Sequence, residues 1–204
     1  MKLFNAAHEK FAFKNRTRRI AELLSELLPE GAMVLDVGCG DGLIDELLLS
    51  TRPDLKILGV DTLLRDKSHI EVTKFDGITL PFENGEFEWV QCIDVLHHAN
   101  NPQNLFMELA RVASKGVVIK DHVANSCFDT KILQMMDWAG NAKHGVALPY
   151  NFLSGDEWQT LFDAGGFSIE RKVEKLKLYP PLLDLFFGRK LHFIAKLEKC
   201  SRKT

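Results

Sequence analysis

A glycine-rich loop is the part of this sequence best suited to bind a ligand. Residues 34–37 read as the end of a short buried strand, and Gly38, Gly40 and Gly42 follow. Apolar residues then recur at helical spacing over residues 43–48. Glycines without a Cβ let a ligand approach the backbone, and the helix that follows turns free N–H groups toward it. Strand, loop and helix together predict a nucleotide-type binding site.

The acidic residues of the loop indicate which kind of ligand it holds. A dinucleotide fingerprint has its third glycine where this chain has Leu43, so the third glycine here comes one residue early. Asp36 and Asp41 would repel a pyrophosphate but tolerate an ammonium group. Cys39, between them, offers a small side chain rather than a nucleophile. The loop therefore favours a ligand that carries a cationic group.

Carboxylates recur where predicted strands end. The apolar runs that predict strands are residues 33–37, 57–61, 72–77, 87–93 and 117–121. They alternate with helical segments, which predicts a parallel sheet with ligands at the carboxyl ends of its strands. Residues at those ends are Asp36, Asp61, Asp76, Ile93 and Asp121. Asp61, 23 residues after Gly38, suits the hydroxyls of a nucleoside ribose; capping of a helix is the alternative.

Candidate general bases gather after the fourth and fifth predicted strands. They are His97, Asp121 and His122, with His144 and Tyr150 in the segment beyond. An ordinary imidazole titrates near pH 6.5, so a histidine here could accept a proton at neutral pH. His98 is interpreted as a hydrogen-bonded structural residue, and Asp121 could instead cap a helix. The spacing of these histidines predicts no metal site.

The remaining segments complete a single domain over residues 1–204. Residues 1–28 predict a helical cover, with the helix itself over residues 8–28. Residues 123–153 interrupt the alternation of strands and helices, and predict an insertion on the substrate side. A helix over 155–164 begins with the capping box of Ser154 and Glu157. Residues 167–197 predict a closing antiparallel hairpin.

Composition bounds the class of protein. The chain has 204 residues, 46% hydrophobic and 26% charged, which is typical of a soluble globular domain. We expect a cytoplasmic protein without a signal peptide or membrane span. The four cysteines lie far apart, so structural zinc is not expected. Charge is uneven: residues 1–20 carry +5, residues 21–170 carry −14 and residues 171–204 carry +7.

Together these features resemble the class I S-adenosylmethionine (SAM)-dependent methyltransferases, in their small type 11 branch. The resemblance covers about residues 30–197 and rests on the loop at 34–42, Asp61, Asp76-Gly77 and residues 87–98, in that order. It implies an α/β fold, a Rossmann-like three-layer sandwich. Its seven-stranded, mostly parallel sheet would have the order 3-2-1-4-5-7-6, with an antiparallel last strand.

The resemblance also implies SAM as cofactor and S-adenosylhomocysteine as product. The implied cofactor-binding residues are Asp36, Gly38, Cys39, Gly40, Asp61, Thr62, Leu63, Asp76, Gly77, Cys92 and Ile93. In this scheme Asp61 takes both ribose hydroxyls and Asp76 accepts from the adenine amino group. Cys92 and Ile93 would reach the amino-acid end. Methyl transfer would then proceed mainly by proximity, which can supply about 7–11 kcal/mol, with general-base help where the acceptor needs it.

The leading hypothesis is a methyltransferase for a small-molecule or lipid-like acceptor. An NAD-dependent oxidoreductase, a nucleic-acid methyltransferase and a non-catalytic SAM-binding protein are the alternatives. The sequence shows no continuous basic stripe, so no nucleic-acid partner is expected. The two basic ends and the apolar residues 179–188 suggest an anionic substrate, a peripheral membrane contact or a homodimer contact.

Overall fold

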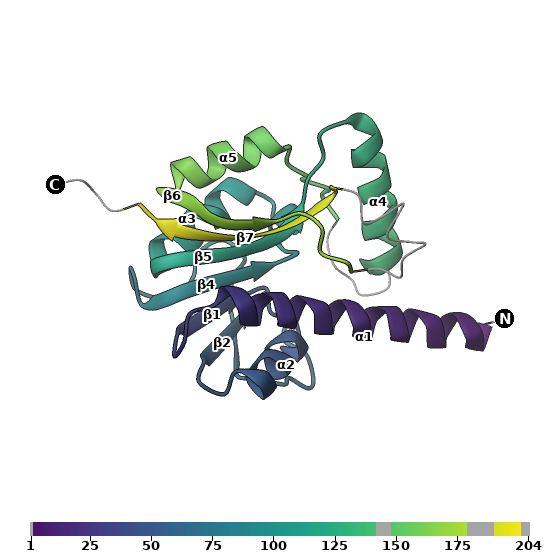
Figure 1. Cartoon of the computed structure of the whole chain (residues 1–204), viewed down its shortest axis with the longest axis horizontal. Coiled ribbons are helices and arrows are strands. Elements are labelled where there is room, and N and C mark those ends of the chain that lie inside the picture. The colour runs from purple at the N-terminus through teal and green to yellow at the C-terminus, as the bar shows by residue number, and fades with distance from the viewer. Residues whose placement is uncertain (1, 142–147, 179–189, 201–204) are drawn as a thin grey trace.

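A seven-stranded sheet forms the centre of the molecule in the computed structural model, which describes residues 2–141, 148–178 and 190–200 (Figure 1). Its strands are β1 (Met33–Val37), β2 (Lys56–Asp61), β3 (Val72–Lys74), β4 (Phe87–Ile93), β5 (Ala113–His122), β6 (Phe167–Val173) and β7 (His192–Lys199). The helices are α1 (Lys2–Leu27), α2 (Leu43–Thr51), α3 (Pro102–Val112), α4 (Cys127–Asn141) and α5 (Gly155–Ala164), with a short 3₁₀ helix η1 (Leu96–His98).

The strand order is β3-β2-β1-β4-β5-β7-β6. The first five strands of the chain pair in parallel, and β7 lies antiparallel between β5 and β6. The fold class and sheet order predicted from the sequence are therefore confirmed. All the parallel strands end at the same edge of the sheet, where ligands bind in such folds.

Alternation along the strands builds two apolar cores, one on each face of the sheet. In β1, Leu35 and Val37 pack with α3 and α5, whereas Val34 packs with α1 and α2. In β5, Val117 and Ile119 face the first core and Val118 the second. Figure 1 shows α3 and α5 on one side of the sheet and α1 and α2 on the other. This is the three-layer arrangement expected.

Local signals fix two helix starts. The Asn101 side chain accepts from the Asn104 N–H at 2.9 Å, ahead of Pro102, and so caps α3. Ser154 and Glu157 form the predicted capping box of α5. The segment 123–153, expected only as an insertion, contains α4 over fifteen residues.

Helix α1 is fastened to the domain at three levels. The Arg52 guanidinium at the end of α2 donates to the carbonyl of Ser25, in the last turn of α1, and to those of Leu28 and Pro29 just after the helix. Farther back, Arg19 donates to the Leu176 carbonyl at 3.1 Å. Arg16 forms an ion pair with Asp94, the residue after β4, at 2.5 Å. The described helices include none that is long and apolar enough to cross a membrane.

Candidate functional site

A cavity of about 670 Å³ opens at the carboxyl ends of β1, β2 and β4. One end is lined by residues of the glycine loop and of the segments after β2 and β3: Gly38, Gly40, Asp61, Thr62, Leu63, Arg65, Phe75, Asp76, Gly77 and Ile78. The rest of the lining comes from residues after β4 and in α3: Asp94, Val95, His98, Ala99, Asn100, Asn101, Asn104 and Leu105. Seven of the eleven residues that the sequence nominated for the cofactor thus lie together.

The glycine loop has the backbone that only glycine adopts without strain. Gly38 has φ +79°, and a Cβ there would lie 2.3 Å from the Cγ2 of Val95. Its N–H donates to the Val60 carbonyl at 2.8 Å, which holds the loop against β2. The backbone at Gly38 and Gly40 therefore forms part of the cavity wall.

Asp61 holds the cavity rim with both carboxylate oxygens. Oδ2 accepts from the Gly40 N–H and Oδ1 from the Leu63 N–H, each at 2.8 Å. The second bond resembles the capping role that was the alternative reading of this residue. Each oxygen has a further lone pair, so the carboxylate can also accept from two hydroxyls of a ligand. Asp61 is thus fixed in place before a ligand arrives.

Asp76 is fixed in a similar way two residues beyond β3, which ends at Lys74 and not at Gly77 as the sequence predicted. Its Oδ1 accepts from the N–H groups of Ile78 and Thr79, both at 2.8 Å. These backbone hydrogen bonds lower the pKa of Asp76. Because both bonds use Oδ1, Oδ2 can accept from a ligand donor such as an exocyclic amine. The residue is exposed at the rim of the cavity.

Asp36 lies beneath the loop and is 4% exposed. It adjoins Asp45 of α2, whose Oδ1 accepts from the Gln91 side chain at 2.7 Å. Burial raises the pKa of Asp36 to about 6, and burial with the charge of Asp36 raises the pKa of Asp45 well above its usual range. Burial and the closeness of the two carboxyls therefore both favour the protonated form within this pair. Asp36 supports the loop from below and does not line the cavity.

Three other nominated residues also lie behind the cavity wall. Cys92 is fully buried and Ile93 is 9% exposed, both within β4. The sulfur of Cys39 points toward Gly59 of β2, where an added Cβ would lie 2.5 Å from it. Burial raises the pKa of the Cys39 thiol, which agrees with a packing role rather than a nucleophilic one.

A buried ionic group lies directly after β4, next to the residue that packs against the glycine loop. Asp94, with φ +58°, receives the Lys120 ammonium on Oδ1 and the Arg16 guanidinium on Oδ2 at 2.5 Å. Lys120 is completely buried. Burial raises the pKa of Asp94, but Lys120 and Arg16 hold it well below its usual range. One carboxylate and two cations leave a net positive charge there.

Of the two histidines after β4, His98 lines the cavity and His97 does not. His98 lines the cavity, with 16% of its side chain exposed. His97 is 2% exposed and its Nδ1 lies 2.6 Å from Asp121 Oδ1. Burial lowers the pKa of His97, but the charge of Asp121 and hydrogen bonds to Asp121 and Asp137 raise it to about 10. From the sequence, His97 was a candidate base and His98 a structural residue, whereas in the structure it is His98 that lines the cavity.

Of the remaining candidate bases, the three that the structure describes do not line this cavity. His122 is 9% exposed, stacks edge-on against His97, and has its pKa lowered to about 4, chiefly by burial. Tyr150 is half-buried, with φ +58°. Asp121 is 1% exposed; its Oδ1 accepts from the His122 N–H and serves His97, so it positions rings rather than capping a helix. His144 lies outside the described residues.

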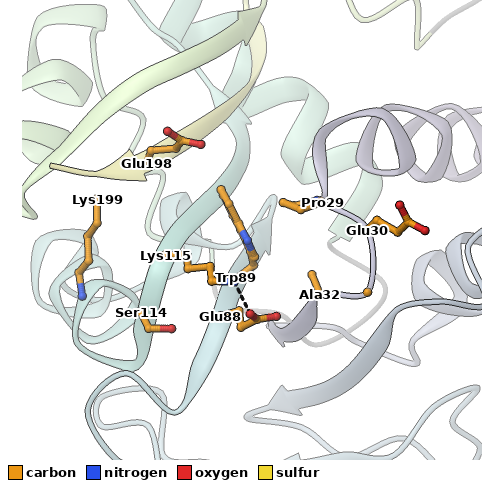
Figure 2. A pocket seen from close by; sticks show the side chains of 10 residues that line it. Pro29, Glu30, Ala32, Glu88, Trp89, Ser114, Lys115, Glu198 and Lys199 are labelled. Atoms are coloured by element: carbon orange, nitrogen blue, oxygen red, sulfur yellow. Dashed lines mark hydrogen bonds and ion pairs between the residues drawn. The ribbon is translucent and has the colours of Figure 1, made fainter. Parts of the chain in front are cut away.

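A second pocket, of about 540 Å³, lies at the opposite edge of the sheet, where the parallel strands begin (Figure 2). Figure 2 shows Glu88, Lys115, Glu198 and Lys199 around it, with the indole of Trp89 between them. Glu88 pairs with Lys115, and Lys199 donates to the Ala113 carbonyl at 2.5 Å. These charges join strand ends, and the pocket lies far from the loop and carboxylates described above.

Comparison with known proteins agrees with this geometry. A family model described as a methyltransferase domain matches residues 12–172. The ubiquinone biosynthesis O-methyltransferase of Maricaulis maris is 24% identical over 172 residues, 77% of this chain and 66% of that protein. The tRNA (carboxymethyluridine(34)-5-O)-methyltransferase alkbh8 of Xenopus tropicalis is 30% identical over 109 residues, 48% of this chain and 16% of that protein.

A solved structure shares the fold over almost its whole length. It is the putative methyltransferase in complex with the Trm112 methyltransferase activator of Haloferax volcanii. The TM-score is 0.67 at 15% identity, covering 95% of this chain and 94% of that one. The chain spans 16% to 66% of the length of the first curated relatives that it matches. The chain belongs to the methyltransferase domain family, and its fold is that of the class I SAM-dependent methyltransferases.

Proposed function

We propose that this chain binds SAM and transfers its methyl group to a small-molecule acceptor. The observation that carries the proposal is the pair of prepositioned carboxylates on one cavity rim, Asp61 and Asp76, beside the glycine loop. Asp61 would accept from the ribose hydroxyls, and Asp76 Oδ2 from the adenine amino group. Thr62 and Leu63 would flank the adenine.

The methionine end of SAM would extend from the glycine loop toward Asp94. The ammonium would then lie near the acidic side of the loop, and the sulfonium methyl would face the half of the cavity lined by Asn100, Asn101 and His98. An acceptor hydroxyl would lose its proton as its oxygen forms a bond to the methyl carbon. When bound, SAM would supply a methyl group on a sulfonium that leaves as a neutral thioether, so that a hydroxyl acceptor would become a methyl ether and release one proton. Holding donor and acceptor in line supplies most of the acceleration.

The acceptor half of the cavity favours an anionic or polar molecule. Asp94 lines this half and is paired with two cations outside the lining, Lys120 and Arg16, so the group carries a net positive charge. The three asparagines of this half offer both donors and acceptors. A small hydroxylated acceptor is consistent with the relative named for ubiquinone biosynthesis. The relatives named for tRNA methylation give a nucleic-acid acceptor as the second candidate.

More specifically, the acceptor would be lipid-like, and one face of α4 would contact the lipid surface. On α4, Phe128, Lys131, Met135 and Trp138 follow one another at intervals of three, four and three residues, so they share one face of the helix. Phe128, Met135 and Trp138 are 61%, 55% and 62% exposed. Apolar rings beside a lysine suit an anionic lipid surface. Sedimentation with anionic vesicles at low salt would test this contact, and failure to bind would remove it. The apolar segment 179–188 lies outside the described residues.

Two measurements test the proposal in order. Calorimetry should show SAM and S-adenosylhomocysteine binding and no binding of NADH, which excludes the oxidoreductase alternative. Labelled SAM should then be offered with the small-molecule, lipid and RNA fractions of a cell extract. Label in the small-molecule or lipid fraction supports the proposal, and label in RNA moves the function to the second candidate. Binding without transfer to any fraction favours a non-catalytic SAM-binding protein.

A further inference from the structure

His97, His98 and Asp137 bring three potential metal-ligand atoms together at the wall of the cavity. We call them the His–His–Asp cluster. Asp137 Oδ1 lies 3.5 Å from His98 Nε2 and 3.8 Å from His97 Nε2. One ligand atom from each of the three residues lies within 4.8 Å of the other two. The two histidines come from η1 and the aspartate from α4, so the cluster joins elements distant in the sequence.

These separations match those of a metal coordination shell. Zinc binds imidazole nitrogen and carboxylate oxygen at about 2.0–2.1 Å in tetrahedral geometry, which places the ligand atoms about 3.3–3.5 Å apart. The two distances to Asp137 Oδ1 exceed this range by no more than about 0.3 Å. Both distances are longer than a strong charge-assisted hydrogen bond, which is near 2.7–2.9 Å, so an ion could replace the weak His97–Asp137 hydrogen bond described above.

The other nitrogen of His97 is held as metal-bound histidines usually are. Its Nδ1 lies 2.6 Å from Asp121 Oδ1, so Asp121 fixes the ring orientation and leaves Nε2 directed at the cluster. A carboxylate behind a ligating histidine makes that histidine a better ligand. Phe152 stacks on the His97 ring with centroids 5.3 Å apart and adds an apolar wall.

A second group of close ligand atoms, in His97, Asp121 and His122, is better explained without a metal. Asp121 Oδ1 is 2.6 Å from His97 Nδ1 and 3.2 Å from His122 Nδ1, and it also accepts from the His122 N–H at 2.8 Å. These are hydrogen-bond lengths, and they leave too little room for an ion. Asp121 is therefore a positioning residue for the first cluster.

The cluster also has access to the cavity. The side chains of His97 and Asp137 are 2% and 3% exposed, whereas that of His98 is 16% exposed and lines the cavity wall. Two imidazoles and one carboxylate are donors that suit zinc and similar transition-metal ions, whereas Mg²⁺ and Ca²⁺ prefer an all-oxygen set. Three protein ligands next to a cavity are typical of catalytic zinc sites, in which a water or substrate takes the fourth position.

We propose that the His–His–Asp cluster binds one divalent transition-metal ion, best matched by zinc, with a coordination position directed into the cavity. This reverses the expectation from the sequence that no metal binds. If the proposed function holds, that position can take the acceptor's oxygen and favour loss of its proton before methyl transfer.

The test uses the full chain freed of metal by a chelator. Calorimetric titration with Zn²⁺ should show one site per chain, and His98→Gln and Asp137→Asn should each weaken binding by about 100-fold or more. Asp121→Asn should weaken it by about 10–100-fold, the usual effect of losing a carboxylate behind a ligand. His69→Gln is the matched control, because His69 pairs with Glu46 on the exposed surface and its loss should change nothing.

Spectroscopy with Co²⁺ in place of zinc identifies the ligand atoms, and it remains informative if a variant does not fold. The expected spectrum is that of a four- or five-coordinate ion with nitrogen and oxygen ligands. A sulfur-to-metal charge-transfer band would instead place the ion on an exposed cysteine, Cys127 or Cys200, and would overturn the proposal. If Asp137→Asn does not fold, the partly exposed His98→Gln and this spectrum decide.

Two further outcomes would also overturn the inference: no stoichiometric Zn²⁺ binding by the wild type, or wild-type affinity in His98→Gln. Either would mean that a proton on His97, rather than a metal ion, links Asp121 to Asp137. SAM affinity is measured on the same samples. If the wild-type protein binds SAM but no Zn²⁺, only the metal site is refuted. If it binds Zn²⁺ but not SAM, only the proposed function is refuted.

Discussion

Replacing Asp61 by alanine should weaken SAM binding by about 10–1000-fold. In the proposed complex the carboxylate accepts from two ribose hydroxyls, and a hydrogen bond to a charged group contributes about 1.5–3 kcal/mol. Two such bonds give about 3–6 kcal/mol, of which water entering the alanine site returns a part. A net loss of about 1.4–4 kcal/mol corresponds to the stated range of affinity.

The structure adds a second cost to the same substitution. Asp61 also accepts from the Gly40 and Leu63 N–H groups, so the alanine variant loosens both the glycine loop and the turn after β2. Asp61→Asn keeps one acceptor oxygen, and its amide donors would face one of those N–H groups. We therefore expect Asp61→Asn to lose affinity as well, which would not follow if size alone mattered.

Calorimetry with SAM measures these losses, with circular dichroism as the check on folding. The control is Asp156→Asn, which removes a carboxylate from an exposed position in the first turn of α5. A folded Asp61→Ala protein with wild-type SAM affinity would refute the cofactor assignment.

Three other perturbations test the structure around the cavity. Gly38→Ala should abolish measurable SAM binding, because the new Cβ meets Val95 at 2.3 Å and φ is +79°; calorimetry decides, and wild-type affinity would contradict the loop geometry. Asp36→Asn should gain stability relative to the wild type as pH rises from about 4 to 8. The pKa of Asp36 in the folded protein, about 6, lies above the usual 3.8, so the wild type loses stability as pH rises through this window, whereas the asparagine does not titrate. Urea melts at several pH values measure this, and the same pH dependence of unfolding free energy in both proteins would contradict it. Lys120→Met should lower unfolding free energy by about 3–5 kcal/mol by leaving Asp94 buried with one partner fewer; a change under 1 kcal/mol in urea melts would show that the charge is not buried.

Much of the fold follows from the sequence because strand ends, glycines and caps are local signals. The strand predicted at residues 87–93 and the helix at 155–164 match β4 and α5 to the residue. Helix α4 was missed for a physical reason. It exposes Phe128, Met135 and Trp138, so apolar residues occupy more than one face and the helical stripe is blurred.

The sequence predicted those cavity residues whose place depends on the backbone, and it was less successful where the direction of a side chain decides whether a residue reaches the cavity. Asp61 and Asp76 were nominated from the ends of predicted strands, and both line the cavity, although β3 ends at Lys74, two residues before Asp76. His98 was assigned a structural role, although it follows β4 as His97 does. The direction of each ring depends on the left-handed φ of Asp94 and on the 3₁₀ turn of η1, neither of which the sequence signals. Asp137 was not considered because its helix was not foreseen.

The last three residues of β5 have a consequence for how the sheet reaches its register. Lys120 is bound to Asp94, Asp121 to His97, and Lys120 and Asp121 point to opposite faces because they are neighbours on a strand. A shift of β5 by one residue against β4 would exchange those faces, and would leave a buried ammonium and a buried carboxylate each without its counter-ion. Apolar residues in this strand are similar on both faces, Val117 and Ile119 on one and Val118 on the other, so hydrophobic packing alone distinguishes the registers poorly. The charges at the end of β5 thus penalise misaligned pairing during folding, in addition to any part they play at the cavity.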